Sequence, residues 1–367
     1  MRIAIDARAL LGQRTGIGTY TSAVARELSA RRENEVGLFL PRPLGEDTDG
    51  LGSAAVEADS HPFGTLWVQT ALPRRLTEWR ADVLLAALTI APLRGETPAV
   101  SVVHDLTPWT HPEWHADRTL AAFLPLWERT LERAARILCV SAATAVDLER
   151  LYPEARGRVR VVWNGVDPEF RPADGADGRL ERERFAGGRP FLLYLGTLEP
   201  RKNVATLVEA CERLWTKDRG RPDLVLAGGS GWKGGPLARR IEASPFRDRI
   251  HLAGYASREM ALALYRAAEA FVYPSFVEGF GLPVLEAMAC ALPVVCSDAA
   301  ALIEVGGDAA LYAPAGDAAA LALAIERALE DPAERQRLRE AGPRRAALFS
   351  WKATAEKTAG VLAEAAA

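Results

Sequence analysis

Short apolar runs alternate with amphipathic stretches along almost the whole chain, and this alternation restricts the fold more than any other feature. In the first half, runs typical of strands lie at 3–6, 36–40, 83–86, 100–104, 137–141 and 159–163. Stretches with helical spacing lie at 17–30, 120–135 and 142–151. Strands that alternate with helices in this way form parallel sheets with helices on both faces.

The second half repeats this plan. Its strand-like runs lie at 191–195, 224–227, 250–252, 271–273, 294–296 and 311–312. Its helical stretches lie at 204–214, 257–267, 282–289, 318–329 and 332–348. A chain of 367 residues is too long for one compact core and suits two domains. We therefore expect an α/β protein made of two doubly wound domains.

The segment 168–188 interrupts the alternation, because it is rich in Gly, Pro, Asp and Arg and poor in apolar residues. It is the expected linker between a first domain at 1–167 and a second at 189–350. The final stretch, 351–367, is expected to form a helix that packs back on the first domain. Ligands of such folds bind at the carboxyl ends of the strands, so a cleft between the two domains is the expected site.

Composition excludes several classes of function. A formal net charge of −3 argues against a nucleic-acid partner. The sequence contains no Cys/His cluster that would indicate a metal site. No apolar run reaches membrane-spanning length. The chain starts with a short strand rather than a signal peptide, so the cytoplasm is the expected location. The cysteines read as small buried residues of a reduced compartment: Cys139, Cys211, Cys290 and Cys296.

Arginines are dense in two parts of the chain. They are Arg129, Arg133 and Arg136 in the first, and Arg335, Arg337 and Arg339 in the second. Solvated helix faces explain such a pattern. A patch that faces a membrane or an acceptor is the alternative, and it leaves peripheral membrane contact open.

The segment 271–290 carries the most chemical information. An apolar strand ends in Pro-Ser, a loop holds Glu278 between glycines, and a helix begins near Leu282 with Pro283 in its first turn. The free N–H groups of a helix start attract an anion such as a diphosphate. Glu278 and Glu286 would repel that anion, but carboxylates accept hydrogen bonds from sugar hydroxyls. The segment therefore suits a ligand that holds a sugar and a phosphate together.

Two motifs of the first half fall at strand ends. Gly16 and Gly18 open the first helix, where they suit either a phosphate or a plain tight turn. The spacing is not GxGxxG, which argues against a dinucleotide. His104 and Asp105 follow a buried strand, so they either face the cleft or form a structural hydrogen-bonded pair.

Three motifs of the second half also follow strands. Gly196 ends a strand, and Arg201 and Lys202 come just before a helix, where cations would neutralise a diphosphate and stabilise it as a leaving group. A surface Arg-Lys pair is the alternative. Two further loops contain glycine and suit either a nucleotide base or a tight turn. The first holds Gly228, Gly229, Ser230, Gly231 and Trp232, and the second holds Gly254 and Tyr255.

Taken together, the motifs resemble the retaining glycosyltransferases of family 4, which have the GT-B fold. The resemblance runs from Met1 to about Leu348. Its most specific part is the paired-glutamate signature, 278–283 followed by Glu286. The other matching positions follow in order: Gly16, His104, 164–167, Lys202, Gly254 and Tyr255.

The resemblance implies a role for most of these residues. Glu286 should bind the ribose hydroxyls. Glu278 and the backbone of Phe280, Gly281 and Leu282 should hold the donor sugar. Lys202 and the Gly16 turn should contact the diphosphate, and His104 should lie beside the transferred sugar. The remaining strand-end residues complete the expected donor site: Gly18, Gly196, Thr197, Gly229, Gly254 and Tyr255.

One departure from the family pattern concerns Thr197. Many members carry arginine there, and Arg201 is the candidate to replace that charge. The segments 197–203 and 104–108 resemble a branch that contains many mannosyltransferases, so GDP-mannose is the first choice of donor. The donor is a co-substrate, and no further cofactor and no metal are expected.

We therefore expect a retaining glycosyltransferase that moves a sugar from a nucleotide sugar to an acceptor hydroxyl. A GT-B sugar-nucleotide 2-epimerase and a catalytically silent sugar-nucleotide-binding subunit are the alternatives. The acceptor should meet loops of the first domain that carry Trp109, Trp114 and His115, with His111 nearby. A polysaccharide, a glycolipid or other lipid-linked sugar, and a small metabolite remain open as acceptors.

Overall fold

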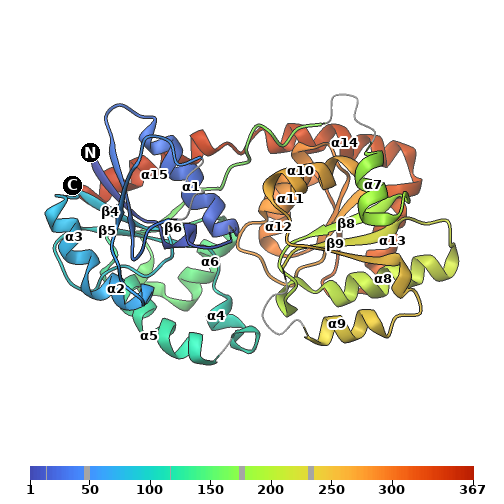
Figure 1. Cartoon of the computed structure of the whole chain (residues 1–367), viewed down its shortest axis with the longest axis horizontal. Coiled ribbons are helices and arrows are strands. Elements are labelled where there is room, and N and C mark those ends of the chain that lie inside the picture. The colour runs from blue at the N-terminus through green and yellow to red at the C-terminus, as the bar shows by residue number, and fades with distance from the viewer. Residues whose placement is uncertain (14, 45–49, 116, 173–177, 230–234) are drawn as a thin grey trace. The chain divides into compact units, whose positions relative to one another are not determined.

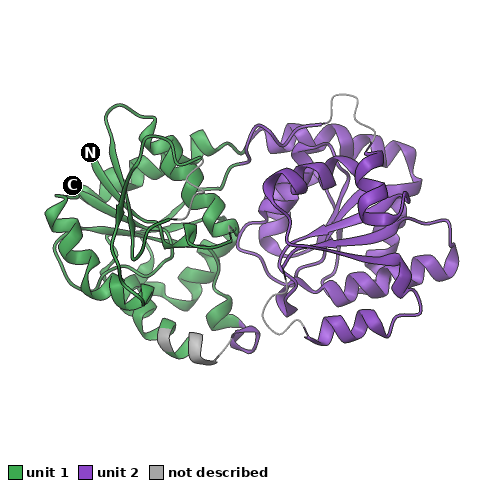
Figure 2. Cartoon of the chain, viewed as in Figure 1, with its two compact units in different colours: residues 1–110, 117–165, 349–367 green, residues 111–116, 166–348 purple. Residues whose placement is uncertain are grey.

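The computed structural model describes residues 1–13, 15–44, 50–115, 117–172, 178–229 and 235–367. It divides into two compact units. Unit 1 holds Met1–Thr110, Asp117–Gly165 and Phe349–Ala367, and unit 2 holds His111–Ala116 and Val166–Leu348 (Figure 2). Each unit is an α/β domain built around its own parallel sheet.

The sheet of unit 1 has seven strands in the order β3-β2-β1-β4-β5-β6-β7. All its neighbouring strands pair in parallel. The central strands are apolar and fully buried, as a sheet covered on both faces requires. The strands are β1 (Arg2–Asp6), β2 (Glu35–Leu40), β3 (Ala55–Ala58), β4 (Val83–Ala86), β5 (Ala99–Val103), β6 (Arg136–Cys139) and β7 (Val159–Val161).

Helices of unit 1 follow its strands along the chain (Figure 1). They are α1 (Gly16–Ser29), α2 (Gly64–Thr70), α3 (Leu72–Glu78), α4 (Thr107–Thr110), α5 (Asp117–Arg133), α6 (Ala142–Leu151) and α15 (Trp351–Ala366). The last of these packs against α1 and against strands β4, β5 and β6. The chain therefore returns to unit 1 at its C-terminal end.

The sheet of unit 2 has six strands in the order β10-β9-β8-β11-β12-β13. These strands also pair in parallel. They are β8 (Phe191–Leu195), β9 (Asp223–Ala227), β10 (Ile250–Gly254), β11 (Ala270–Tyr273), β12 (Val294–Ser297) and β13 (Leu311–Ala313). The helices are α7 (Arg179–Ala186), α8 (Val204–Lys217), α9 (Gly235–Glu242), α10 (Arg258–Ala267), α11 (Leu282–Ala289), α12 (Ala300–Gly306), α13 (Ala318–Glu330) and α14 (Pro332–Ala346).

The segment 168–188, expected as a linker, falls within unit 2. Its residues 173–177 lie outside the described part of the chain. The residues after them form α7, which packs against α10, β9 and β10. The helix is hard to recognise because only Ala186 of its eight residues is buried. Arg182 holds it in place, since its guanidinium lies 2.9 Å from the Glu269 carboxylate.

Candidate donor-binding site

Two loops of unit 2 carry the cationic and acidic candidates. The strand order places β8 beside β11, and the connections run outward from this pair in both directions. Open α/β sheets bind ligands at such a switch point, at the carboxyl ends of the strands. Lys202 lies in the short helix η4 (Pro200–Lys202) that follows β8. Glu278 lies in the loop that follows β11.

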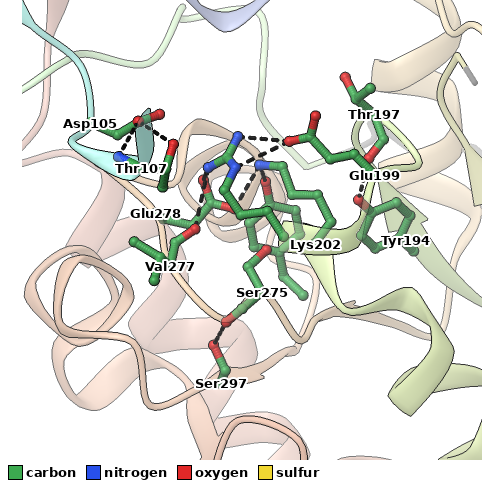
Figure 3. A network of polar contacts seen from close by, with 12 residues as sticks. Asp105, Thr107, Tyr194, Thr197, Glu199, Lys202, Ser275, Val277, Glu278 and Ser297 are labelled. Atoms are coloured by element: carbon green, nitrogen blue, oxygen red, sulfur yellow. Dashed lines mark hydrogen bonds and ion pairs between the residues drawn. The ribbon is translucent and has the colours of Figure 1, made fainter. Parts of the chain in front are cut away.

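The ammonium group of Lys202 is held between two acceptors (Figure 3). Its Nζ donates to Glu278 Oε1 at 2.6 Å and to the Tyr273 hydroxyl at 2.7 Å. Arg201 donates from Nη1 to the second oxygen of Glu278 at 3.2 Å, and its Nη2 lies 2.9 Å from Glu199. One buried carboxylate is thus shared by two cations, and Glu199 balances the remaining positive charge. We call these four side chains, Glu199, Arg201, Lys202 and Glu278, the cation cluster.

Burial and charge act in opposite directions inside the cation cluster. The side chains of Lys202 and Glu278 are only 9% and 7% exposed. Burial raises the pKa of Glu278, but the charges of Lys202 and Arg201 outweigh burial and bring it down to about 2. Burial lowers the pKa of Lys202, and the Glu278 carboxylate offsets this effect only in part. Glu278 is therefore a carboxylate at neutral pH.

The start of α11 offers backbone donors next to this cluster. Gly281 precedes the helix with φ +110°, a conformation that favours glycine, and a Cβ there would lie 2.7 Å from Leu302 Cδ2. Pro283 occupies the first turn, as expected. Within the described ranges, the Leu282 N–H has no acceptor. A helix start of this kind suits an anion.

Glu286 lies one turn into α11. Its Oε2 accepts a hydrogen bond from the Tyr265 hydroxyl at 3.0 Å. Burial raises the pKa of Glu286 to about 7, although the Tyr265 hydrogen bond acts in the opposite direction. Arg258 and Asp167 contribute to its electrostatic surroundings and pair with each other at 2.7 Å. Glu286 is therefore poised to change charge near neutral pH.

The glycines at the ends of β8, β9 and β10 differ in how closely other atoms surround them. A Cβ at Gly228 would lie 2.0 Å from the carbonyl oxygen of Gly196, so only glycine fits there. The Gly228 N–H donates to the Gly254 carbonyl at 2.6 Å. At Gly229 and Gly254 an added Cβ would meet no atom of the described residues within 4 Å, so these positions leave space for a ligand as far as the described chain extends. Tyr255 is exposed, and the next part of the Gly229 loop, residues 230–234, lies outside the described ranges.

His104 follows β5 in unit 1. Its Nε2 donates to the Ala87 carbonyl at 2.8 Å, and its ring meets Tyr20 edge-on. Burial lowers its pKa, so the imidazole is neutral at pH 7. Asp105 instead accepts hydrogen bonds from the backbone and hydroxyl of Thr107 at the start of α4. In these hydrogen bonds, His104 and Asp105 each bind a partner other than one another.

The other candidates of the first half differ in their surroundings. Gly16 is exposed at the start of α1, whereas Gly18 is buried within it. Trp109 packs against Trp127 at 4.0 Å between ring centres, inside a core cluster that explains its presence without a ligand. Of the residues expected to meet the acceptor on loops of the first domain, Trp109 lies in unit 1, but Trp114 and His115 belong to unit 2. Trp114 stacks on His111 and on Phe276, and His115 is half-buried.

Sequence reasoning missed the tyrosines that support the two glutamates. Tyr273 and Tyr194 stack at 5.8 Å beneath the cation cluster, and Tyr194 donates its hydroxyl to the Thr197 carbonyl. Tyr265 binds Glu286. All three rings lie in apolar segments, where an aromatic residue gives no signal beyond core packing. Their contacts to Lys202 and Glu286 join residues far apart in the sequence, which no local pattern reveals.

Two further findings concern the described residues. All four cysteines are free and buried. No helix in the described ranges is long and apolar enough to cross a membrane.

Comparison with known proteins assigns the chain to a family. The pattern described as "Glycosyltransferase Family 4" matches residues 14–170, and "Glycosyl transferases group 1" matches residues 179–345. O-antigen chain mannosyltransferase B of Escherichia coli is 34% identical over 255 residues, which are 69% of this chain and 67% of the relative. The MMP alpha-(1->4)-mannosyltransferase of Mycolicibacterium hassiacum is 28% identical over the whole chain and 98% of the relative.

The fold has close structural neighbours. Sucrose-phosphate synthase of Thermosynechococcus elongatus superposes with a TM-score of 0.79 at 24% identity, over 98% of this chain and 97% of its own. This likeness and the two parallel sheets confirm the expected GT-B fold. The chain belongs to glycosyltransferase family 4 and is similar to its mannosyltransferases.

Proposed function

We propose that this glycosyltransferase moves mannose from GDP-mannose to an acceptor hydroxyl and retains the anomeric configuration. The observation that carries the proposal is the cation cluster beside the start of α11, with Glu286 one turn further on. In a nucleotide sugar the diphosphate lies between the sugar and the ribose. The two cations and the start of α11 suit the diphosphate, and the Glu286 carboxylate further along α11 suits the ribose hydroxyls. The names of two relatives, both mannosyltransferases, favour mannose.

Charge inside the cation cluster explains how it can serve a diphosphate. Without donor, Glu278 and Glu199 hold Lys202 and Arg201 in place. A bound diphosphate competes for these cations, and the cost of rearranging them is small because both are already desolvated and positioned. Arg201 donates a hydrogen bond to Glu278, as Lys202 does. This shared partner supports the idea that Arg201 replaces the arginine that many family members carry at the position of Thr197.

Catalysis then rests on electrostatic stabilisation of the leaving group. As the bond between sugar and diphosphate lengthens, negative charge builds on the diphosphate. Lys202, Arg201 and the N-terminus of α11 stabilise that charge more in the transition state than in the ground state. The acceptor attacks from the leaving-group face, and the departing phosphate oxygen accepts its proton. His104, neutral, hydrogen-bonds the sugar rather than acting as a base.

A donor panel tests this proposal against its two rivals. Purified protein is incubated with GDP-mannose, UDP-glucose or dTDP-glucose, with and without mannoside acceptors. Transfer from GDP-mannose to an acceptor supports the proposal. Conversion of the donor to its 2-epimer without acceptor would establish the epimerase. Tight donor binding with no turnover over a broad panel of glycan, lipid-linked and small-molecule acceptors would establish the silent subunit.

The raised pKa of Glu286 predicts a pH-dependent donor affinity. The carboxylate accepts hydrogen bonds from ribose hydroxyls better than the protonated acid does. We therefore expect the Kd for GDP to fall as pH rises from 6 to 8, through the pKa of about 7. Glu286→Gln should remove this dependence and weaken binding by about 1.5–3 kcal/mol at pH 8. Isothermal titration calorimetry across this range measures both effects.

Glu286→Gln is expected to weaken GDP binding but to stabilise the fold. Measuring the stability of the variant therefore serves as a control for the binding experiment. A buried acid with a raised pKa favours the folded state below its unfolded-state pKa, and this contribution is lost as pH rises through about 7. At pH 8 the native protein carries a buried charge, and Glu286→Gln removes it. We expect the variant to unfold at higher urea concentration than the native protein. Unchanged GDP affinity in a stable variant would remove the ribose assignment.

Fixed cations also predict transfer that does not need a metal ion. Lys202, Arg201 and the start of α11 already serve the diphosphate, so we expect the initial rate of transfer to stay within about twofold in excess EDTA. A known metal-dependent glycosyltransferase assayed in parallel provides the control. Loss of activity that magnesium or manganese restores would contradict this part of the proposal.

A further inference from the structure

A second charged hollow lies in unit 2, away from the cation cluster. It is a cavity of about 230 Å³ at the amino ends of strands β11 and β12. Glu278 and the start of α11 lie instead at the carboxyl ends of the strands. The cavity is smaller than the roughly 300–1,000 Å³ of sites that hold drug-sized ligands, so it suits a small molecule. We call it the arginine cavity.

Four arginines and one glutamate line the arginine cavity. They are Arg182 from α7, Arg266 from α10, Arg335 and Arg339 from α14, and Glu269. Four positive charges against one negative charge leave an excess of three in the lining. A small anion with more than one negative charge would balance this excess.

Three of these arginines are already held in place. Arg182 and Arg335 both bind Glu269, at 2.9 and 2.5 Å. Arg266 donates from Nε to the Arg171 carbonyl at 3.0 Å. Arginine forks that are fixed in this way lose little side-chain entropy when they bind an anion.

Donor capacity in the cavity nevertheless exceeds the acceptors present. Arg335 Nε is enclosed and has no hydrogen-bond partner. Arg339 is exposed and makes no ion pair or hydrogen bond within the described residues. A buried N–H without an acceptor costs free energy, and a ligand oxygen would remove that cost.

We propose that the arginine cavity binds a phosphate group, carried by a small phosphorylated molecule or by a lipid headgroup. Phosphate offsets most of the excess charge, because it carries up to two negative charges, and it brings three acceptor oxygens. Its oxygens fit the fork of a guanidinium group. This site is separate from the one proposed for the donor diphosphate, and it requires neither transfer nor a particular donor.

Calorimetric titration of the full chain with inorganic phosphate, at constant ionic strength, tests the proposal. We expect saturable binding that Arg335→Gln and Arg339→Gln each weaken roughly tenfold or more. Arg344→Gln is the matched control, since Arg344 is an exposed arginine of the same helix outside the cavity. Lys202→Ala should leave this binding unchanged, which separates it from phosphate bound at the donor site.

Vesicles distinguish the two sources of phosphate. Sedimentation with phosphatidic acid vesicles, whose phosphate is a monoester, but not with phosphatidylcholine vesicles, that is lost in Arg339→Gln would assign a lipid headgroup. Phosphate binding without sedimentation would assign a small soluble ligand. The proposal fails if phosphate does not bind, or if Arg335→Gln and Arg339→Gln bind it as tightly as the native chain. Because Arg339 is exposed, its variant keeps the test valid even if Arg335→Gln fails to fold.

Discussion

Replacing Lys202 with alanine is expected to lower kcat by about a hundredfold to a thousandfold, with a much smaller change in the donor KM. The reason is that charge on the diphosphate grows while the sugar bond breaks, so a cation fixed beside it contributes most in the transition state. Burial strengthens this effect, since the side chain of Lys202 is 9% exposed and little water screens its charge. Steady-state kinetics with GDP-mannose measures the split between kcat and KM.

Two further variants make this result specific. Lys217→Ala removes a lysine that is 65% exposed at the end of α8 and should leave both constants unchanged. Arg201→Ala should also reduce kcat, which would support its replacing the arginine missing at Thr197. A fully active Lys202→Ala enzyme would exclude the diphosphate role, and a raised donor KM with unchanged kcat would mean that Lys202 contributes equally to the ground state and the transition state.

Replacing Glu278 with alanine is expected to reduce the free energy of unfolding of unit 2 by about 3 kcal/mol at pH 7. The substitution leaves two buried cations without the carboxylate that they share at 2.6 and 3.2 Å. Arg201 keeps Glu199 and Lys202 keeps the Tyr273 hydroxyl, so we expect a value at the low end for a broken buried pair. Urea denaturation monitored by tryptophan fluorescence measures the change.

The pH dependence of this loss identifies its cause. The pKa of Glu278 falls from an ordinary 4.5 to about 2 in the folded protein, so its stabilising contribution is present above pH 4.5 and is lost as pH falls toward 2. The difference between the native protein and Glu278→Ala should shrink over the same window. Glu199→Ala is the control, because its side chain is 23% exposed and removing it should cost about 1 kcal/mol or less. An equal loss at pH 3 and pH 7 would mean that packing, rather than charge, explains the effect.

Apolar patterning predicted both sheets because their central strands are buried on both faces. Strands β8 and β11 consist almost wholly of buried apolar residues, so they form runs that polar loops interrupt. The edge strand β3 was missed because Ala55 and Val56 are exposed and its pattern is weak. Helix α7 was missed for the same reason, since only Ala186 of its eight residues is buried. Elements that bury little apolar surface leave little trace in the sequence.

Local patterns supplied the candidate residues of the site, and they described its geometry only within the short segment from Glu278 to Glu286. The spacing from Glu278 to Glu286, with glycine and proline between them, gives a loop and a helix start from local rules. The pairing of Lys202 with Glu278 spans 76 residues, and it depends on β8 and β11 lying side by side. The raised pKa of Glu286 depends on burial, which the sequence does not display. Local patterns therefore supply the candidates, and the fold supplies their partners.

The anomeric configuration of the product tests the proposed function most directly. GDP-mannose labelled with carbon-13 at C1 is incubated with the enzyme and mannoside acceptors, and the one-bond carbon–proton coupling at C1 of the first product is read by NMR. In the proposed function the cation cluster stabilises the leaving diphosphate, and His104 is neutral and bound to the Ala87 carbonyl. We therefore predict an α-linked mannoside. A β-linked product would contradict both the retaining mechanism and the role proposed for Glu278.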